Sequence, residues 1–149
     1  MDRDYYIYNN DVLVAKLFLS ALLRLERVNL AIVSAILPLV LDESICSLIE
    51  KEHFTLINIL KIQRNKLVNF NDQYCDALPI MVNGISILLD LKLAYLENEY
   101  LKVGDKDLPM VNSDLGQRVI RLTNVFFQLY TDAQNMPLYS LYKQLNIQL

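Results

Sequence analysis

The sequence predicts a mainly α domain that carries one β-hairpin, and the main evidence lies between Asn69 and Val103. Within this stretch the period of the apolar residues changes from that of a helix to that of a strand. They recur every three or four positions and then every second one: Leu78, Val82, Ile85 and Leu89, followed by Leu91, Leu93 and Tyr95. Helical patterns lie on both sides of the stretch. A helix that leads into a hairpin among other helices is typical of a winged-helix-like helical domain.

Length and composition predict one domain over residues 1–149. A chain of 149 residues has the usual size of a single domain and can bury a sizeable core. It is 54% hydrophobic, more than an ordinary soluble domain, so it has surplus apolar surface to cover. Its net charge of −3 provides no global attraction for nucleic acid. Any DNA contact must therefore be local or supplied by a partner.

Three helices are expected in the first third of the chain. Asn10 and Asp11 offer N-cap oxygens before a long apolar run. In the second helix Pro38 lacks the N–H that a helix interior needs, so the helix is expected to bend or end there. Asp42 and Ser44 can cap the third. The expected ranges are 11–27, 29–41 and 44–51.

Two further helices are expected before the hairpin. The first is amphipathic, with Lys61, Arg64 and Lys66 outside its apolar stripe. In the second, Pro79 is expected in the first turn, where its missing N–H is harmless, and Gly84 lies in the middle. Glycine inside a helix costs about 1 kcal/mol relative to alanine, so we expect a close packing contact at Gly84. The expected ranges are 54–68 and 76–89.

The hairpin is predicted over residues 92–103, and two helices follow it. Its strands flank a turn at Asn98, a residue type that tolerates a positive φ angle. The polar cluster at residues 112–114 can cap a long helix. The expected strands are 92–96 and 100–103, and the expected helices are 114–131 and 138–145.

No pattern in the chain predicts an enzyme, a cofactor or a metal site. His53 is the single histidine, and a surface or helix-capping role is the simplest interpretation. Cys46 and Cys75 are far apart and have no second pair, which excludes the usual zinc spacings and predicts free thiols in a reducing cytoplasm. The three glycines are dispersed and match no phosphate-binding loop. No catalytic residue, cofactor or metal is therefore expected.

The chain is expected to be cytoplasmic and to make no membrane contact. Its most apolar run, Val28 to Leu41, includes two polar residues and a proline, and a spanning helix needs about 20 apolar residues. The first residues lack the basic start and the apolar core of a secretory signal.

The group Lys61, Arg64 and Lys66 is the sharpest candidate for a binding site. Phosphate contacts need lysines and arginines clustered on one face, so the group can be a nucleic-acid contact. It can equally be a contact for an acidic protein partner or a solvated helix side. The sequence leaves these three interpretations open.

The charges of the hairpin argue both ways about DNA. Lys92 and Lys102 could extend a basic face from the preceding helices onto the hairpin. Glu97 and Glu99 flank its turn, however, and their carboxylates would repel a phosphate backbone. This arrangement favours a hairpin that contacts protein.

Tyrosines gather near both ends of the chain. Tyrosine favours interfaces because one end of the side chain packs while the other forms hydrogen bonds. The alternative is that these residues cover the edges of the domain itself. They are Tyr5, Tyr6, Tyr8, Tyr139 and Tyr142.

Short apolar and capping motifs follow one another in a defined order. They are Leu37-Pro38-Leu39-Val40-Leu41, an amphipathic helix with Arg64, a proline-bearing helix before a hairpin, Ser113-Asp114-Leu115-Gly116 with Arg118, and Leu145-Asn146-Ile147-Gln148-Leu149. In this order and spacing, from about Asn10 onward, the chain resembles the middle component of bacterial ABC-three-component systems. The Lamassu anti-phage and anti-plasmid systems are similar in composition.

The resemblance implies a small non-catalytic subunit that docks on an ATPase of the SMC or Rad50 type, beside a nuclease-like effector protein. Such a subunit would couple DNA sensing to the effector and would contact DNA indirectly, through the complex. The resemblance carries over no functional residue. Two other hypotheses remain: a winged-helix DNA-binding transcription regulator, and a small helical interaction protein with a hydrophobic groove.

Overall fold

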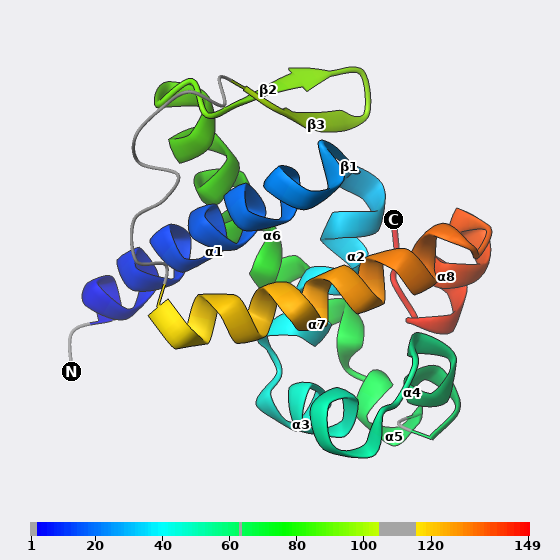
Figure 1. The fold of residues 1–149 in the computed structure, drawn as a ribbon. Helices are drawn as coiled ribbons and strands as arrows, with labels where there is room; N and C mark the ends of the chain where they lie inside the picture. The colour runs from blue at the N-terminus through cyan, green and yellow to red at the C-terminus, as the bar shows by residue number, and fades with distance from the viewer. Residues whose placement is uncertain (1–2, 63, 105–115) are drawn as a thin grey trace.

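The computed structural model describes residues 3–62, 64–104 and 116–149. This part of the chain is mainly α-helical and includes a three-stranded antiparallel sheet, which confirms the predicted fold class at this level. Figure 1 shows the sheet at one end of the molecule and α4 and α5 at the other. The elements are α1 (Arg3–Leu25), β1 (Arg27–Asn29), α2 (Leu30–Leu41), α3 (Glu43–Glu52), α4 (Leu56–Ile62), α5 (Arg64–Leu67), α6 (Phe70–Asp90), β2 (Ala94–Glu97), β3 (Tyr100–Val103), α7 (Gly116–Gln134) and α8 (Leu138–Gln144).

Helix α1 begins at Arg3, so the prediction that it begins near Asp11 is wrong. Asp11 does not act as an N-cap because it lies in the interior of α1; its Oδ2 accepts a hydrogen bond from Asn83 Nδ2 of α6 at 3.1 Å, and its Oδ1 has no hydrogen-bond partner among the described residues. A contact with a distant helix therefore uses the oxygen that the local sequence assigns to a cap.

Helices α1 and α6 approach closely at Gly84. A Cβ atom on Gly84 would lie 2.9 Å from Val14 Cγ1 and 3.2 Å from the backbone nitrogen of Ala15. The close packing contact expected at this glycine is confirmed.

Helix α2 forms the centre of the core, where it packs against α6 and α7. Every residue from Val33 to Val40 is buried. Pro38 does not end the helix, which continues to Leu41, where Asp42 follows as the C-cap residue. A proline in a helix interior costs about 3 kcal/mol, and burial of nearly the whole helix offsets this cost because packing supplies most helical stability in proteins.

Helix α6 begins at Phe70 rather than at residue 76, so Pro79 lies in the helix interior and its predicted place in the first turn is wrong. The side chains of Phe70 and Tyr74 are buried, with exposed fractions of 1% and 8%. The burial of these two side chains stabilises the additional turns at the beginning of α6. The polar residues around them predict a break in the chain rather than a helix.

The sheet contains a strand that the sequence pattern does not predict. Strand β1 pairs antiparallel with β3, and the strand order is β1-β3-β2. Backbone hydrogen bonds extend the pairing at both ends, from Leu30 N to Glu99 O and from Val103 N to Glu26 O, each 2.9 Å long. Three residues are too few for an alternating pattern, so only the distant partner strand reveals β1. The predicted single hairpin is thus part of a larger sheet.

The hairpin itself agrees with the prediction in its second strand and its turn. Asn98 has a φ angle of 54°, as expected for the turn residue. Strand β2 begins at Ala94, two positions later than predicted, because Lys92 has a φ angle of 58° that an extended strand does not allow.

The predicted helix over residues 54–68 corresponds to α4 and α5, which lie on either side of residue 63, a position outside the described residues. The backbone N–H of Leu56 donates to Asp132 Oδ2 at 3.0 Å, and Gln128 Nε2 donates to Phe54 O at 2.8 Å. Asp132 and Gln128 both belong to α7, whereas Phe54 and Leu56 lie at the beginning of α4 or just before it. Hydrogen bonds to α7 therefore determine where α4 begins.

The remaining helices lie close to their predicted ranges. Helices α3 and α8 match within a residue at each end, and α7 continues to Gln134, beyond the predicted end at residue 131. The predicted capping cluster 112–114 and the first two residues of that helix lie outside the described residues.

Buried aromatic side chains connect the last two helices to the rest of the core. The ring of Phe126 in α7 stacks on the ring of Tyr130, and their centroids are 5.9 Å apart. The centroid of the Phe18 ring in α1 lies 6.2 Å from that of Phe126. Tyr130 Oη accepts a hydrogen bond from Asn29 N at 2.8 Å. Tyr142 Oη of α8 donates to Ala31 O at 2.7 Å. These tyrosines fasten the start of α2, so Tyr142 covers an edge of the domain.

Within the described ranges, no single helix is long and apolar enough to cross a membrane. Helices α2 and α3 pass such a test only as a pair, and they are bent by 87° relative to each other.

Candidate functional site

Two of the three predicted site residues line a hollow between α4, α5 and α8. Lys61 comes from α4 and Arg64 from α5, and Lys143 from α8 joins them. The hollow has a volume of about 540 Å³ and is also lined by Leu60, Leu67, Gln144 and Asn146. The side chain of Lys66, the third predicted site residue, lies outside the part of the chain that the structure describes. We call this site the basic hollow.

The C-terminal segment is held against the basic hollow by specific contacts. Asn146 Nδ2 donates to Leu67 O at 3.1 Å, and Gln148 N donates to Asn71 Oδ1 at 2.8 Å. Leu141 and Leu145 are fully buried beside them. These contacts explain why Lys143 lies beside Lys61 and Arg64, which local sequence patterns could not indicate.

The basic hollow contains cations without carboxylates. No acidic residue occurs in the sequence between His53 and Asn71 or from Ala133 to Leu149, the two segments that form it. In the part of the chain that the structure describes, Lys61, Arg64 and Lys143 form no ion pair. Their charges are therefore available to an external partner.

The hairpin lysines do not extend the basic hollow. The sheet lies at the opposite end of the molecule from α4 and α5 (Figure 1), and Lys102 forms an ion pair with Glu97. The prediction that Lys92 and Lys102 could share a face with Lys61 and Arg64 is wrong. The chain topology separates the two groups.

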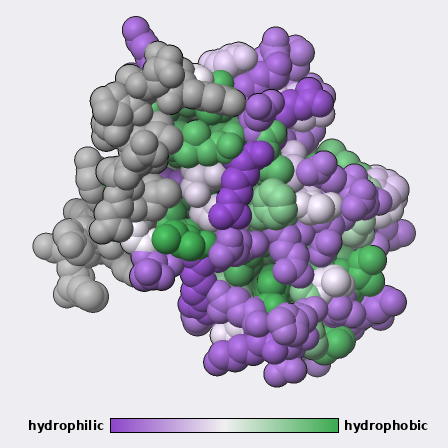
Figure 2. Space-filling view, in the orientation of Figure 1, coloured by the Kyte–Doolittle hydropathy of each residue, from purple (hydrophilic) through white to green (hydrophobic). Residues whose placement is uncertain are grey.

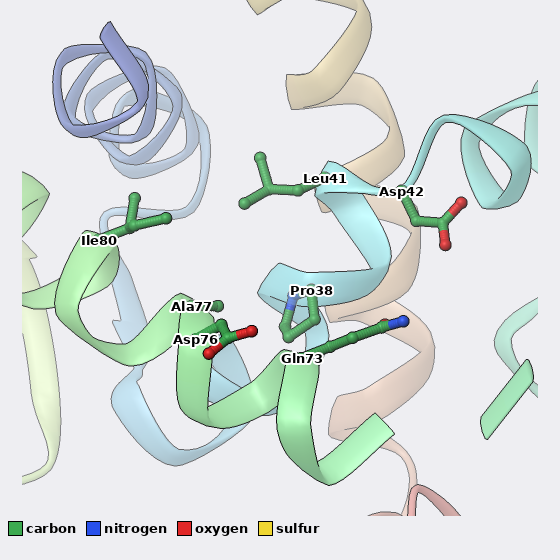
Figure 3. Close-up of a pocket in the computed structure, with 7 residues that line it drawn as sticks. All are labelled: Pro38, Leu41, Asp42, Gln73, Asp76, Ala77 and Ile80. Carbon is green, nitrogen blue, oxygen red and sulfur yellow. The ribbon is translucent and has the colours of Figure 1, made fainter. Parts of the chain in front are cut away.

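Helix α6, which precedes the hairpin, has an acidic character. It carries Asp72, Asp76 and Asp90 and contains no lysine or arginine. Figure 3 shows Asp76 and Gln73 of α6 facing Pro38 and Asp42 across a pocket of about 310 Å³. Asp42 Oδ1 already accepts hydrogen bonds from the backbone of Ser44 and Ile45 and so caps α3. This face does not suit a phosphate backbone.

Arg121 forms the best-defined ion-pair group among the described residues. Its Nε donates to Glu50 Oε1 at 2.6 Å, and its Nη2 lies 2.7 Å from Glu43 Oε1. The hydrogen bond from Arg121 lowers the pKa of Glu43 below its usual value. The group joins α7 to α3 and is open to solvent, so water screens the attraction between its charges.

His53 occupies the end of α3. It is exposed and has a φ angle of 53°, the left-handed conformation that often ends a helix. The predicted surface or capping role is confirmed. The described residues contain no group of three or more histidine, cysteine, aspartate or glutamate side chains that could hold a metal ion.

The two cysteines differ in accessibility and form no disulfide with each other. Cys46 is buried and its Sγ donates to Val40 O at 3.1 Å, whereas Cys75 is exposed on α6. Burial raises the pKa of the Cys46 thiol from 9.0 to about 11. The fold therefore favours the neutral thiol, and this contribution to stability is lost as the pH rises from 9.0 toward about 11.

Iodoacetamide applied to the native protein at about pH 8 is expected to modify Cys75 and leave Cys46 intact, because the thiolate is the reactive form. Peptide mass spectrometry measures the modified fraction of each residue. Both cysteines should react at similar rates after unfolding in urea, which serves as the control. Equal modification of the two in the native protein would contradict this assignment.

Hydrophobic side chains are exposed at both ends of the molecule. Tyr95 and Leu96 are each 49% exposed on β2, which is an edge strand of the sheet. Ile57 of α4 and Tyr139 of α8 are 51% and 76% exposed. Figure 2 shows scattered apolar residues among hydrophilic ones over the lower part of the molecule, where α3, α4 and α5 lie. We call Tyr95 and Leu96 the wing surface.

Comparison of the chain with protein-family models, with curated proteins and with solved structures finds no match.

Proposed function

We propose that this chain is a non-catalytic accessory subunit that docks on an SMC/Rad50-like ATPase. In this proposal it couples DNA sensing by the complex to an effector nuclease in anti-phage or anti-plasmid defence, inside the cytoplasm. The observation that carries the proposal is the charge of α6, the helix beside the hairpin, which has three aspartates and no cation. A protein-docking role fits this face better than direct contact with DNA.

The topology is compatible with a winged-helix-like domain. A helix and a short strand precede a set of helices, a hairpin follows, and the last strand lies in the middle of the sheet. In such a domain α6 would take the place of the helix that enters a DNA groove, and β2 and β3 would form the wing. Helix α6 and the wing turn are both acidic, so we propose that the arrangement serves as a scaffold for a protein partner.

The wing surface offers a partner one apolar side chain on each face of the edge strand. Tyr95 and Leu96 are adjacent on β2 and therefore point to opposite faces of the strand, and both are half exposed. Among the described residues the outer backbone edge of β2 has no partner strand, and such an edge can pair with a strand of another chain. Tyrosine and leucine on such an edge favour protein docking over a role in solvation.

Co-expression tests the proposal directly. We expect the chain to form a stable complex with an SMC-like ATPase encoded beside it, measured by affinity purification and size-exclusion chromatography. The double variant Tyr95→Glu, Leu96→Glu should lose the complex, because carboxylates in an apolar interface leave unpaired charges. Ile120→Glu on α7, where the isoleucine is 45% exposed, is the matched control and should retain it. A stable monomer that ignores the ATPase would contradict the proposal.

A winged-helix transcription regulator remains the second candidate, because the basic hollow offers cations without carboxylates. This function requires that the isolated protein binds duplex DNA and that the binding weakens with salt. Fluorescence anisotropy with a labelled duplex at low ionic strength decides between the two. Absence of binding there would exclude the regulator.

A further inference from the structure

We infer that the basic hollow binds an acidic, partly apolar segment of a partner protein. This inference rests on the proposed docking function and names the chemistry of one contact. It adds Lys143, Gln144 and Asn146 to the predicted residues Lys61 and Arg64.

Three helices bring the cations of the basic hollow together. Lys61 and Arg64 belong to α4 and α5, while Lys143 comes from α8, near the other end of the chain. The net charge of the chain is −3, yet the segments around the hollow contain no acidic residue. Like charges placed together without counter-charges repel one another. An acidic ligand would relieve this repulsion, so charge complementarity identifies the class of ligand.

The floor of the hollow is apolar. Leu60 and Leu67 line it and are only 4% and 3% exposed. Lys61 and Lys143 each follow an exposed hydrophobic side chain by one helical turn, Ile57 and Tyr139 respectively. The Lys143 Nζ lies 6.0 Å from the centre of the Tyr139 ring. A ligand with both carboxylates and an apolar side chain therefore matches the hollow and its rim.

A short peptide fits this site better than a nucleic acid. The volume of about 540 Å³ accommodates a few side chains at a concave surface rather than a backbone that continues across the molecule. A longer polyanion would reach beyond the hollow and meet a protein whose net charge is −3. The aspartates Asp72 and Asp76 of α6 would repel it further.

Binding of a fluorescein-labelled peptide tests the inference with the full chain. The probe is a short synthetic peptide of glutamate, aspartate and leucine, and fluorescence anisotropy gives its Kd. The triple variant Lys61→Glu, Arg64→Glu, Lys143→Glu is expected to weaken binding by roughly tenfold or more. Binding to the unaltered protein should also weaken at about 0.3 M salt, because ions screen exposed charges.

Four controls make the result specific. Lys16→Glu reverses an exposed charge on α1, away from the hollow, and should change the Kd by less than about twofold. A peptide in which glutamine and asparagine replace the acids should not bind, and circular dichroism must show that the triple variant is folded. Ile57→Ser with Tyr139→Ser, which retains every cation, should weaken binding of the leucine-containing peptide but not of one that has serine instead.

Several outcomes would overturn the inference. They are the absence of measurable peptide binding, equal binding to the triple variant, and tighter binding of a DNA duplex than of the peptide to the same hollow. Self-association that the triple variant abolishes would replace the partner with a second copy of this chain. Loss of the ATPase complex in the wing-surface variant, with peptide binding retained, leaves this inference intact. An ATPase complex that never forms contradicts only the proposed function.

Discussion

Replacing Phe126 with alanine is expected to reduce the free energy of unfolding by about 3–5 kcal/mol, the usual cost of removing a buried phenyl ring. The Phe126 side chain is completely buried. It stacks on Tyr130 and contacts Phe18, so its loss leaves a cavity between α1 and α7 and removes an aromatic pair. Urea denaturation followed by circular dichroism measures the change. A domain of this size has a stability of about 5–15 kcal/mol, so much of it would be lost.

The neighbouring residue provides a matched control for this substitution. Phe127 follows Phe126 in α7, is 38% exposed and contacts Arg24 through its ring face. Phe127→Ala should cost clearly less than Phe126→Ala, because its ring is only partly buried and its cation–π contact contributes about 0.5–1 kcal/mol. If the two alanine variants had the same stability, Phe126 would not occupy the core in solution.

Replacing Gly84 with leucine is expected to destabilise the protein by about 2 kcal/mol, because overpacking a core costs up to about 3 kcal/mol and the better helix propensity of leucine returns about 1 kcal/mol. The Cβ atom alone would lie 2.9 Å from Val14 Cγ1 and 3.2 Å from Ala15 N. The second atom belongs to the backbone of α1, so the clash cannot be relieved by rotating a side chain.

Ser86→Leu is the control for the leucine substitution in α6. Ser86 is exposed on the same helix, two residues further on, and its Oγ donates to Val82 O. The change should shift the stability by less than about 0.5 kcal/mol, as is usual for surface positions. Urea midpoints of the two variants are then compared. A Gly84→Leu variant as stable as Ser86→Leu would mean that α1 and α6 are further apart than described.

The two substitutions also bear on function, because they act at different distances from the candidate surfaces. Gly84 determines how closely α1 approaches α6, the helix that leads into β2 and the wing surface. Phe126 and Tyr130 stabilise the start of α2 through Asn29. A folded variant at either position with a lost ATPase complex would indicate that docking depends on the packing beneath the wing surface.

Sequence reasoning located most helices and the hairpin because their apolar residues have a period. It also recognised Gly84 as a packing position, since a glycine inside a helix needs a compensating contact. It misplaced the beginnings of α1 and α6 for a related reason. One carboxylate oxygen of Asp11 accepts its hydrogen bond from another helix, and Phe70 and Tyr74 are buried in the core.

The candidate site was only half visible in the sequence. Lys61 and Arg64 stand out because they lie close together beside an apolar stripe. Lys143 is a single lysine in a short helix, and no local signal relates it to them. The one available hint was that residues 53–71 and residues 133–149 both lack acidic residues in a protein whose net charge is negative. This shared feature could have indicated that the two segments form one site.

Local patterns by themselves determined that this protein is mainly helical, that a hairpin follows a long helix, and that no recognisable catalytic motif is present. The tertiary structure alone decided that β1 completes the sheet, that α6 begins at Phe70, and that α8 brings Lys143 to the basic hollow. The physical reason is that periodicity and capping act over a few residues. Strand pairing, burial and the gathering of charged side chains at one site depend on residues that are distant in the chain.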